Sequence, residues 1–190
     1  MNALQSQITV TLYTLFQMTI PHYLNTERIT IRRFIKSDEE CFIKFMTDSR
    51  IVNNLALDDK SKTEQGAKDL LEATVRSYDK DLPLMAFAIE VKASKEFIGV
   101  CGLSPLNNFE IEVFYALFPD FWGKGIATEA LKRLKEFIFT KTNYSTIKAY
   151  IKKGNDSSKK VALKNDFRDV GLVENKNFSD KVYLFSLTKE

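Results

Sequence analysis

The sequence predicts one α/β domain built on a mixed β-sheet, and three observations support this fold class. The chain has 190 residues, a length typical of a single domain. Hydrophobic residues make up 44% of it and include 15 Phe, which is enough for a full core. Segments with the period of strands or of helices follow in the order strand, two helices, three strands, helix, strand, helix, strand, which is typical of helices packed on a mixed sheet.

The boundaries of these elements follow from alternation and from helix-start signals. The first strand is predicted at 28–34, where apolar and polar residues alternate. Two capping-box patterns, Ser37 to Glu40 and Ser61 to Glu64, indicate the starts of the first two helices. The other strands are predicted at 85–91, 97–103, 110–118, 146–151 and 182–188. The other helices are predicted at 125–140 and 157–166.

Charge and residue types exclude several classes of function. The formal net charge of +3 is too small to indicate nucleic acid as the main partner. The two cysteines, Cys41 and Cys101, form no C-x-x-C pair and lie in apolar segments. We therefore expect reduced, mostly buried thiols in a cytoplasmic protein and no zinc site. His22 is the only histidine and lies far from any motif, so histidine triads and multi-histidine metal sites are excluded and no metal is expected.

Residues 1–23 are predicted to be an N-terminal extension, and residues 24–190 to form the domain. The apolar run at 8–24 is interrupted by Thr, Gln, Pro and His, and no Lys or Arg precedes Arg28. These features argue against a signal peptide and against a membrane span. Two alternatives stay open: either Met18 is the true start, or the extension is an extra strand or helix packed on the domain.

The most informative segment runs over 118–130 and combines a strand end, a glycine-containing loop and a helix start. The first N–H groups of a helix have no internal partner and carry partial positive charge. Gly123 and Gly125 let the backbone approach a ligand closely, so the segment is typical of a phosphate or pyrophosphate site. A Walker loop would need Ser or Thr where Gly125 stands, and a dinucleotide fingerprint would need Gly in place of Thr128, so both are excluded.

The string Trp-Gly-Lys-Gly-Ile-Ala-Thr-Glu-Ala-Leu at 122–131 resembles the pyrophosphate loop of GNAT acetyltransferases. It is most similar to the subgroup of the ribosomal-protein N-acetyltransferases RimJ and RimL. The superfamily pattern is Q/R-x-x-G-x-G/A, and Trp122, Gly125 and Ala127 stand at its first, fourth and sixth positions. Trp at the first position departs from the general pattern but is usual in this subgroup.

The resemblance extends over about 24–188. The stretch Thr-Glu-Arg-Ile-Thr-Ile-Arg at 26–32 resembles the first strand of the subgroup, and Asn-x-x-Ser at 155–158 resembles the start of its last helix. The family's Lys-Leu-Gly-Phe is here Lys-Asn-Asp-Phe at 164–167. Asp166 therefore replaces Gly at a left-handed cap, which is allowed at some cost.

The resemblance implies a GNAT fold, with a mixed, mostly antiparallel central sheet splayed at its fourth and fifth strands and about four helices. It also implies that acetyl-CoA is the co-substrate and that a primary amine attacks it directly in a ternary complex. Neither cysteine lies in the motif, which argues against an acyl-cysteine route. The acceptor is a protein N-terminal amine or a small-molecule amine, and a homodimer is common among such proteins. The alternatives are a CoA-binding module without catalysis and an unrelated phosphate-ligand enzyme.

The resemblance also implies how the cofactor is held. Backbone N–H groups of the loop and the helix start would bind the pyrophosphate: Gly123, Lys124, Gly125, Ile126, Ala127 and Thr128. Backbone groups at the splayed strand end would bind pantetheine, together with Asn155: Ala116, Leu117 and Phe118. A basic stretch surrounds the last helix and is either an attractant for the CoA charges or a solvated lysine face: Lys148, Lys152, Lys153, Lys159, Lys160 and Lys164.

The resemblance places two catalytic candidates, Glu112 and Ser158. An alkylammonium has a pKa of about 10.4 and cannot attack a thioester until it loses a proton, which a carboxylate can accept directly or through water. Glu110 has the same facing and is the second candidate, and either Glu could instead only pair with a Lys. Ser158 would assist the leaving thiolate, or alternatively satisfy helix N–H groups. Trp122 is expected to pack under the loop.

Overall fold

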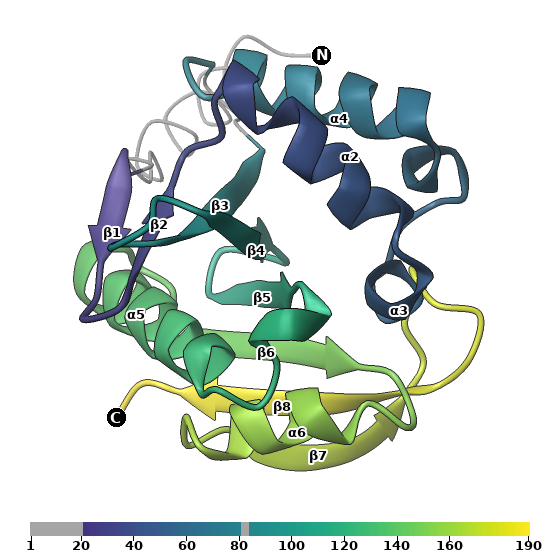
Figure 1. Cartoon of the computed structure of the whole chain (residues 1–190). Coiled ribbons are helices and arrows are strands. Elements are labelled where there is room, and N and C mark those ends of the chain that lie inside the picture. Colours follow the sequence, from purple (N-terminus) through teal and green to yellow (C-terminus); the bar gives the residue numbers. More distant parts are fainter. Residues whose placement is uncertain (1–20, 81–83) are drawn as a thin grey trace, which may run out of the picture.

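One sheet of eight strands organises the fold (Figure 1). The computed structural model describes residues 21–80 and 84–190. The strands are β1 (Tyr23–Asn25), β2 (Ile29–Arg32), β3 (Met85–Val91), β4 (Phe97–Pro105), β5 (Glu110–Leu117), β6 (Thr146–Ile151), β7 (Arg168–Val173) and β8 (Val182–Thr188). Their order in the sheet is β1-β2-β3-β4-β5-β6-β8-β7. Only β5 and β6 pair in parallel, so the predicted mixed, mostly antiparallel sheet is confirmed.

The helices lie in two groups on the sheet. They are α2 (Glu39–Thr47), α3 (Ser49–Val52), α4 (Glu64–Ser77), α5 (Ile126–Lys141) and α6 (Asp156–Leu163). In Figure 1, α2 and α4 lie together at the top, whereas α5 and α6 lie on the other side of strands β2–β5. The described chain thus has five α-helices where about four were predicted, and the additional one is the single turn of α3.

Aromatic side chains fill the space between α2 and the sheet. Phe45 is fully buried, and its ring packs edge-on against Phe97 and Phe118, with ring centroids 6.1 and 5.2 Å apart. Phe34 contacts Phe42 in the same way at 5.1 Å. The opposite face of the sheet is covered by the apolar stripe of α5, as its helical spacing predicts. The cluster fixes the end of β5, where the loop at 119–125 begins.

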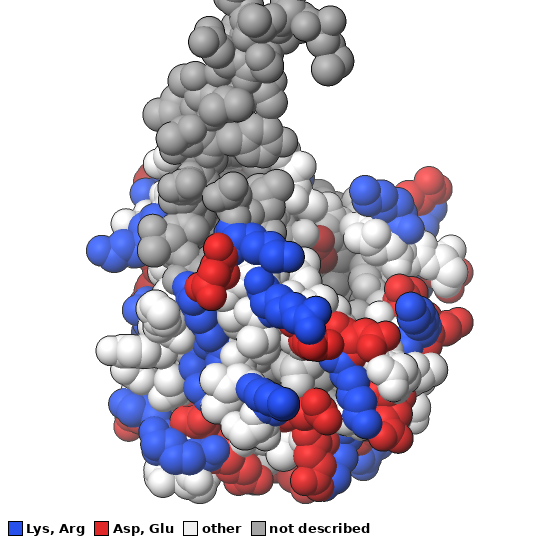
Figure 2. Space-filling model, turned by 90° about the horizontal axis from the view of Figure 1, so that it is seen from above, with Lys and Arg blue, Asp and Glu red and all other residues white. Residues whose placement is uncertain are grey.

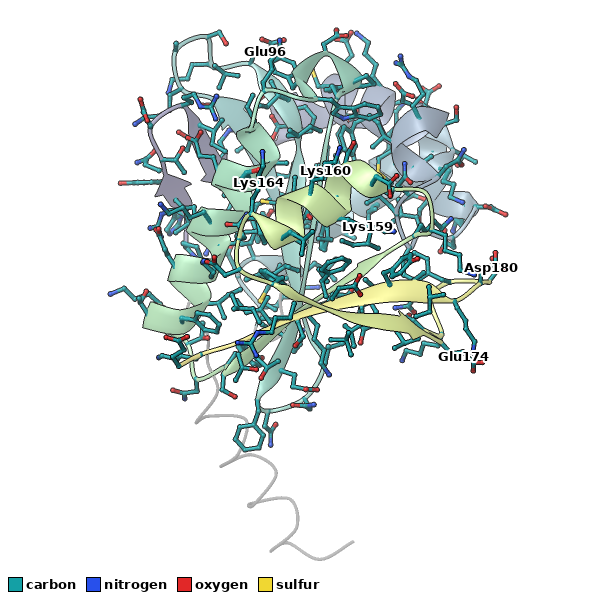
Figure 3. All side chains as sticks on the ribbon, turned by 90° about the horizontal axis from the view of Figure 1, so that it is seen from below. Glu96, Lys159, Lys160, Lys164, Glu174 and Asp180 are labelled. Atoms are coloured by element: carbon teal, nitrogen blue, oxygen red, sulfur yellow. The ribbon has the colours of Figure 1, made fainter. Side chains whose placement is uncertain are left out.

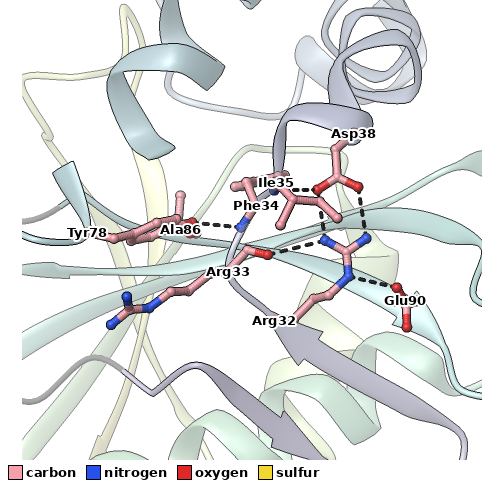
Figure 4. Close-up of polar contacts among 8 residues, drawn as sticks. All are labelled: Arg32, Arg33, Phe34, Ile35, Asp38, Tyr78, Ala86 and Glu90. Carbon is pink, nitrogen blue, oxygen red and sulfur yellow. Dashed lines mark hydrogen bonds and ion pairs between the residues drawn. The ribbon is translucent and has the colours of Figure 1, made fainter. Parts of the chain in front are cut away.

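The first two helices start differently from the predicted capping boxes. Ser37 lies in a 3-10 turn, and α2 begins at Glu39. The group that organises this start is Asp38, which accepts two hydrogen bonds from Arg32 at 2.8 Å and one from the Ile35 N–H at 2.9 Å (Figure 4). The Arg32 guanidinium pairs with Asp38 because its two N–H donors fit the two oxygens of a carboxylate, whereas a serine hydroxyl has one oxygen.

The start of α4 is also displaced from the prediction. Thr63 is its N-cap, and the Thr63 hydroxyl accepts the N–H of Gly66 at 3.0 Å. Ser61, which the capping-box pattern selected, lies in the preceding 3-10 turn. Lys60 closes that turn through its carbonyl, which accepts the Thr63 N–H at 3.1 Å. The turn moves the helix start two residues along the chain.

Two strands were not predicted from the sequence, and both lie at the edges of the sheet. β1 has three residues and pairs with β2. β7 pairs with β8, but a register shift between Asp169 and Gly171 interrupts it, and the side chains of Val170 and Leu172 are exposed. β1 is too short for an alternating pattern to be recognised, and β7 lacks the alternation of buried and exposed residues on which the prediction depends. Residues 1–20, which hold most of the predicted extension and Met18, lie outside the described residues.

The sheet splits between β5 and β6, as expected for the fourth and fifth strands when β1 is left out of the count. The two strands pair only over Glu110–Glu112 and Thr146–Lys148. Beyond Glu112, β5 continues along β4 as far as Leu117, while β6 continues along β8 to Ile151. The backbone groups of β5 that face the split are therefore available to other partners.

Charge is mixed on the surface over α2 and α4. Figure 2 shows Lys and Arg interspersed with Asp and Glu on the visible part of this face, without a single-sign patch. This agrees with the small net charge of +3. Within the described ranges, no helix is both long enough and apolar enough to cross a membrane.

Candidate active site

A cavity of about 590 Å³ occupies the split between β5 and β6. One end is lined by the 123–128 loop and helix start and by the first turns of α6. The middle is lined by strand residues 113–117 and 149–151. α3 and the turn after it, including Arg50 and Asn54, also line the cavity. The cavity therefore reaches from the α5–α6 side of the sheet to the side that carries α2–α4, which allows two ligands to enter from opposite faces.

The predicted pyrophosphate loop forms one wall of this cavity. Gly123 and Gly125 have positive φ angles of 72° and 75°, a conformation that glycine adopts without steric cost. A Cβ built on Gly123 would meet nothing within 4 Å, so open space adjoins the loop here. Gly125 is the N-cap of α5, and Ile126, Ala127 and Thr128 line the cavity. The free N–H groups of a helix start thus lie beside open space, an arrangement that fits a pyrophosphate.

Lys124 differs from the other loop residues because it does not line the cavity. Its Nζ lies 5.3 Å from the ring centroid of Phe121, and its carbonyl accepts a hydrogen bond from Arg28 at 2.9 Å. Its side chain is thereby engaged on the protein. Any contribution of Lys124 to a ligand would come from its peptide group.

Asn155 and Ser158 lie together at the start of α6 and both line the cavity. Asn155 is the N-cap, and its Oδ1 accepts the Ser158 N–H at 3.1 Å. The Ser158 carbonyl accepts a hydrogen bond from the Tyr115 hydroxyl at 3.0 Å, which ties α6 to β5 across the split. Burial raises the pKa of Tyr115, so its hydroxyl stays a donor. Within the described residues, the Ser158 hydroxyl has no hydrogen-bond partner and remains available.

Of the six lysines in the basic stretch around α6, two line the cavity and four do not. Figure 3 shows Lys160 and Lys164 on the side of α6 that faces the loop, and both line the cavity. Lys159 lies on another side, with its Nζ 3.6 Å from the ring centroid of Tyr183. Lys148 pairs with Glu110, and Lys152 donates to the Asn53 carbonyl at 2.7 Å, so these two are engaged elsewhere. Lys153 is exposed and does not line the cavity.

The three residues predicted at the strand end have different positions. Ala116 and Leu117 line the cavity. Phe118 does not, because its ring belongs to the aromatic cluster and its N–H donates to the Ile98 carbonyl. Trp122 was expected to pack under the loop, but it is 48% exposed and lines the cavity. Its indole Nε1 donates to the Leu117 carbonyl at 2.7 Å, so it caps a backbone group at the split.

Glu110 and Glu112 lie on one face of β5 but have different surroundings. Lys148 Nζ lies 2.7 Å from Glu110 Oε1, and this bond, together with one from Asn107, lowers the pKa of Glu110 despite partial burial. The side chain of Glu112 makes no hydrogen bond or ion pair with any described residue, and burial raises its pKa. Glu112 is not itself part of the cavity wall, which begins on β5 at Val113.

Tyr150 and α3 complete the lining of the cavity. Burial raises the pKa of Tyr150, Lys148 opposes this rise, and the charges of Glu112 and Glu110 add to it. Arg50 is held by Asp48, with Nη2 2.6 Å from Oδ2. The sequence reasoning singled out neither Tyr150 nor Arg50 as site residues. In the sequence, the feature that pointed to Tyr150 was its place two residues after Lys148, which puts both side chains on one face of the predicted strand.

Neither cysteine lines the cavity. Cys101 is fully buried, and burial raises its pKa, so it stays a thiol. Cys41 is half-buried on α2 and does not line the cavity. In the part of the chain that the structure describes, no group of three His, Cys, Asp or Glu side chains could hold a metal ion.

Comparisons with known proteins agree with this geometry. An uncharacterized N-acetyltransferase, p20, of Bacillus licheniformis is 29% identical over 172 residues, covering 87% of this chain and 96% of that protein. A ribosomal-protein-S5-alanine acetyltransferase from Vibrio fischeri superposes with a TM-score of 0.70 at 21% identity, covering 88% and 97% of the two chains. A spermidine N-acetyltransferase from Vibrio cholerae, in complex with CoA and spermine, gives 0.71 at 18%, covering 85% and 95%.

The family model of the acetyltransferase (GNAT) domain matches residues 28–168, a range that contains both strands at the split, β5 and β6, together with the glycine loop and α6. On this match, and with the sheet order and cavity described above, the chain belongs to the GNAT acetyltransferase family.

Proposed function

We propose that this chain transfers the acetyl group of acetyl-CoA to a primary amine by direct attack, with both substrates bound together. The observation that carries the proposal is the cavity that passes through the split sheet. The loop and helix start form part of its wall, and Glu112, whose carboxylate is unpaired among the described residues, directly precedes the wall residue Val113 on β5. A thioester held between β5 and β6 would be open to an amine that arrives from the face carrying α2–α4.

Acetyl-CoA fits the wall formed by the loop and α6. The N–H groups of 123–128 would bind the pyrophosphate, with Lys160 and Lys164 supplying opposite charge from α6. Ala116 and Leu117 would present backbone groups to pantetheine at the strand end. Asn155 Oδ1 is already bonded to Ser158, so its amide NH₂ is the group left for the cofactor.

Glu112 is the proposed base. The acceptor ammonium must lose one proton before its nitrogen lone pair can attack the thioester carbonyl carbon. A raised pKa makes Glu112 a better proton acceptor than Glu110, whose pKa is lowered by Lys148. The C–S bond then breaks, the departing thiolate takes the second proton that the attacking nitrogen loses, and Glu112 returns its own proton to water. The free hydroxyl of Ser158 is the proposed group that assists this departure.

The acceptor belongs to one of two chemical classes, a protein N-terminal amine or a small-molecule amine. The structural neighbours include enzymes whose names specify a ribosomal-protein alanine and spermidine, one from each class. Both classes present an unhindered primary amine, which is what a base beside the split requires. We therefore propose the reaction for primary amines in general.

Thermal unfolding in the presence of acetyl-CoA, CoA and ATP tests the cofactor. A ligand at about 100 times its dissociation constant should stabilise the fold by roughly 2.7 kcal/mol. Stabilisation by both CoA compounds but not by ATP supports the proposal, and a screen of dipeptides and polyamines for CoA release then follows. No effect of millimolar acetyl-CoA would contradict it. Binding without transfer to any amine would favour a CoA-binding module without catalysis.

A further inference from the structure

The turn between β1 and β2 contacts the loop and α5 through one cluster of polar groups. Glu129 lies in the first turns of α5, and its side chain is 18% exposed. The Arg28 N–H and Nε donate to its two carboxylate oxygens at 2.9 and 2.6 Å. The Thr26 hydroxyl lies 2.5 Å from Oε1. Burial alone would raise the pKa of Glu129, but the bonds from Thr26 and Arg28 lower it, so the carboxylate stays charged.

Arg28 also reaches the loop itself. Its Nη1 donates to the carbonyl of Lys124 at 2.9 Å. Its Nη2 lies 3.6 Å from the position that a Cβ on Gly125 would occupy, so the guanidinium lies against the loop. One arginine therefore joins the carboxylate of α5 to a peptide group of the glycine loop, and the fork of the guanidinium is what allows both bonds.

The bond to the Lys124 carbonyl determines where the next N–H points. A trans peptide is planar, so the Gly125 N–H points away from the Lys124 carbonyl and hence away from Arg28. Gly125 lines the cavity, and its N–H has no hydrogen-bond partner among the described residues. The loop carries glycines with positive φ on both sides of Lys124, and such a backbone would otherwise change the orientation of this peptide at little cost.

We propose that Arg28, anchored by Glu129, is a positioning residue for the cofactor, because it fixes the Lys124–Gly125 peptide with its N–H directed at the pyrophosphate. This inference rests on the proposed function, since it needs acetyl-CoA as the ligand. It also gives a role to the Thr-Glu-Arg stretch at 26–28, which contributes no group to the cavity wall.

Calorimetric binding of acetyl-CoA and of S-acetylpantetheine, which lacks the phosphates, tests the proposal. Arg28→Ala is expected to weaken acetyl-CoA binding about tenfold, the scale of one hydrogen bond at a charged site, and to leave S-acetylpantetheine unchanged. Arg28→Lys should not restore the affinity, because an ammonium cannot bridge Glu129 and Lys124 as a fork. Glu129→Ala should weaken acetyl-CoA similarly, and the double variant should lose little more than either single variant.

Arg133→Ala is the matched control. Arg133 also extends from α5 to the same turn, where it donates to the Asn25 carbonyl at 3.2 Å, but it does not contact the loop. It should lower the melting temperature without changing the affinity for acetyl-CoA. If Arg28→Ala binds acetyl-CoA normally, if Arg28→Lys restores full affinity, or if both ligands are weakened equally, the positioning role is wrong while the proposed function stands. If the unmodified protein itself does not bind acetyl-CoA, both proposals fail.

Discussion

Two parts of the cavity wall are built from different kinds of groups. At the loop, backbone N–H groups of one continuous segment face the space, and they are oriented by positive φ angles and a helix start. Elsewhere side chains line the space, among them Tyr150 of β6 and Arg50 of α3, and the charge of Glu112 acts on Tyr150. Backbone groups do not depend on which side chains stand at their positions, whereas a wall of side chains changes with each substitution. The proposed cofactor therefore rests on backbone geometry, and the proposed acceptor rests on side chains.

The largest expected effect is on the rate of acetyl transfer and not on cofactor binding. Glu112→Gln should lower the rate of acetyl transfer by about 100-fold to 10,000-fold, the range for loss of a general base. Acetyl-CoA affinity should stay unchanged because Glu112 does not line the cavity. Glu110→Gln is the control, since Glu110 lies on the same face but is paired with Lys148. Equal losses in both variants, measured by CoA release, would contradict the assignment.

The pH dependence should sharpen the same contrast. Since burial raises the pKa of Glu112, the rate of acetyl transfer should fall as the pH drops below a pKa that lies above the ordinary 4.5.

The same rise in the pKa of Glu112 has a consequence for stability. Below the unfolded value the folded and unfolded states are both protonated, and as pH rises the buried carboxylate must ionise without a partner, which destabilises the fold. Glu112→Gln should therefore raise the melting temperature at pH 8 and not at pH 4. A lower melting temperature at pH 8 would show that the lost activity reflects damage to the fold.

A glycine substitution in the loop should weaken cofactor binding, whereas one elsewhere should only lower stability. Gly123→Ala should lower the free energy of unfolding by roughly 1–2 kcal/mol, because its φ is 72°, and should weaken acetyl-CoA binding by about tenfold. Gly171 on β7 also has positive φ and open space around it, but it lies outside the cavity wall. Gly171→Ala should show a similar loss of stability and normal binding. Normal binding by Gly123→Ala would remove the loop from the site.

The bond across the split should have a smaller effect. Tyr115→Phe removes the hydroxyl that donates to the Ser158 carbonyl and should cost about 1 kcal/mol of stability, with a modest loss of acetyl-CoA affinity. The matched control is Tyr78→Phe, because the Tyr78 hydroxyl bonds Phe34 and Ala86 away from the cavity. Denaturant unfolding and calorimetry measure the two quantities. An affinity loss in the control equal to that in Tyr115→Phe would show a general effect of stability.

The smallest effect concerns the cap after α6. Asp166 has a φ of 70°, as predicted from its place in the family's Lys-Leu-Gly-Phe string, and its carboxylate pairs with Lys135 at 2.9 Å. Asp166→Gly should relieve backbone strain but lose an exposed ion pair that solvent screens. The net result should be a small gain in stability. Asp166→Asn, which loses only the charge, separates the two contributions in a denaturant titration.

The sequence predictions were accurate where a feature depends on neighbouring residues and failed where it depends on residues far apart in the chain. The order of the predicted strands and helices and the left-handed cap at Asp166 depend on neighbouring residues, and they are confirmed. The starts of the first two helices were wrong because Arg32, on the preceding strand, makes Asp38 the organising group, and because a 3-10 turn precedes Thr63. The edge strand β7 was missed since its side chains do not alternate between core and solvent.

The site residues that the sequence did not identify also depend on contacts between distant segments. The sequence could not choose between Glu110 and Glu112, because the choice depends on Lys148, which the parallel pairing of β5 and β6 brings alongside. Arg50 was not singled out because α3 is a single turn whose position depends on the packing of α2. Tyr115 was not assigned a role since its partner is a backbone carbonyl on α6. Each omission is a contact between segments far apart in the chain.

Trp122 gives the protein an optical signal of its own. It is the only tryptophan in the chain, and it lies half-exposed on the cavity wall with its indole bonded to the Leu117 carbonyl. Indole emission responds to the polarity and hydrogen bonding of its surroundings, so filling the cavity should shift the fluorescence of a single, identified residue. Cofactor binding and its rate can then be followed in the unlabelled protein, by stopped-flow mixing, before any acceptor amine is known.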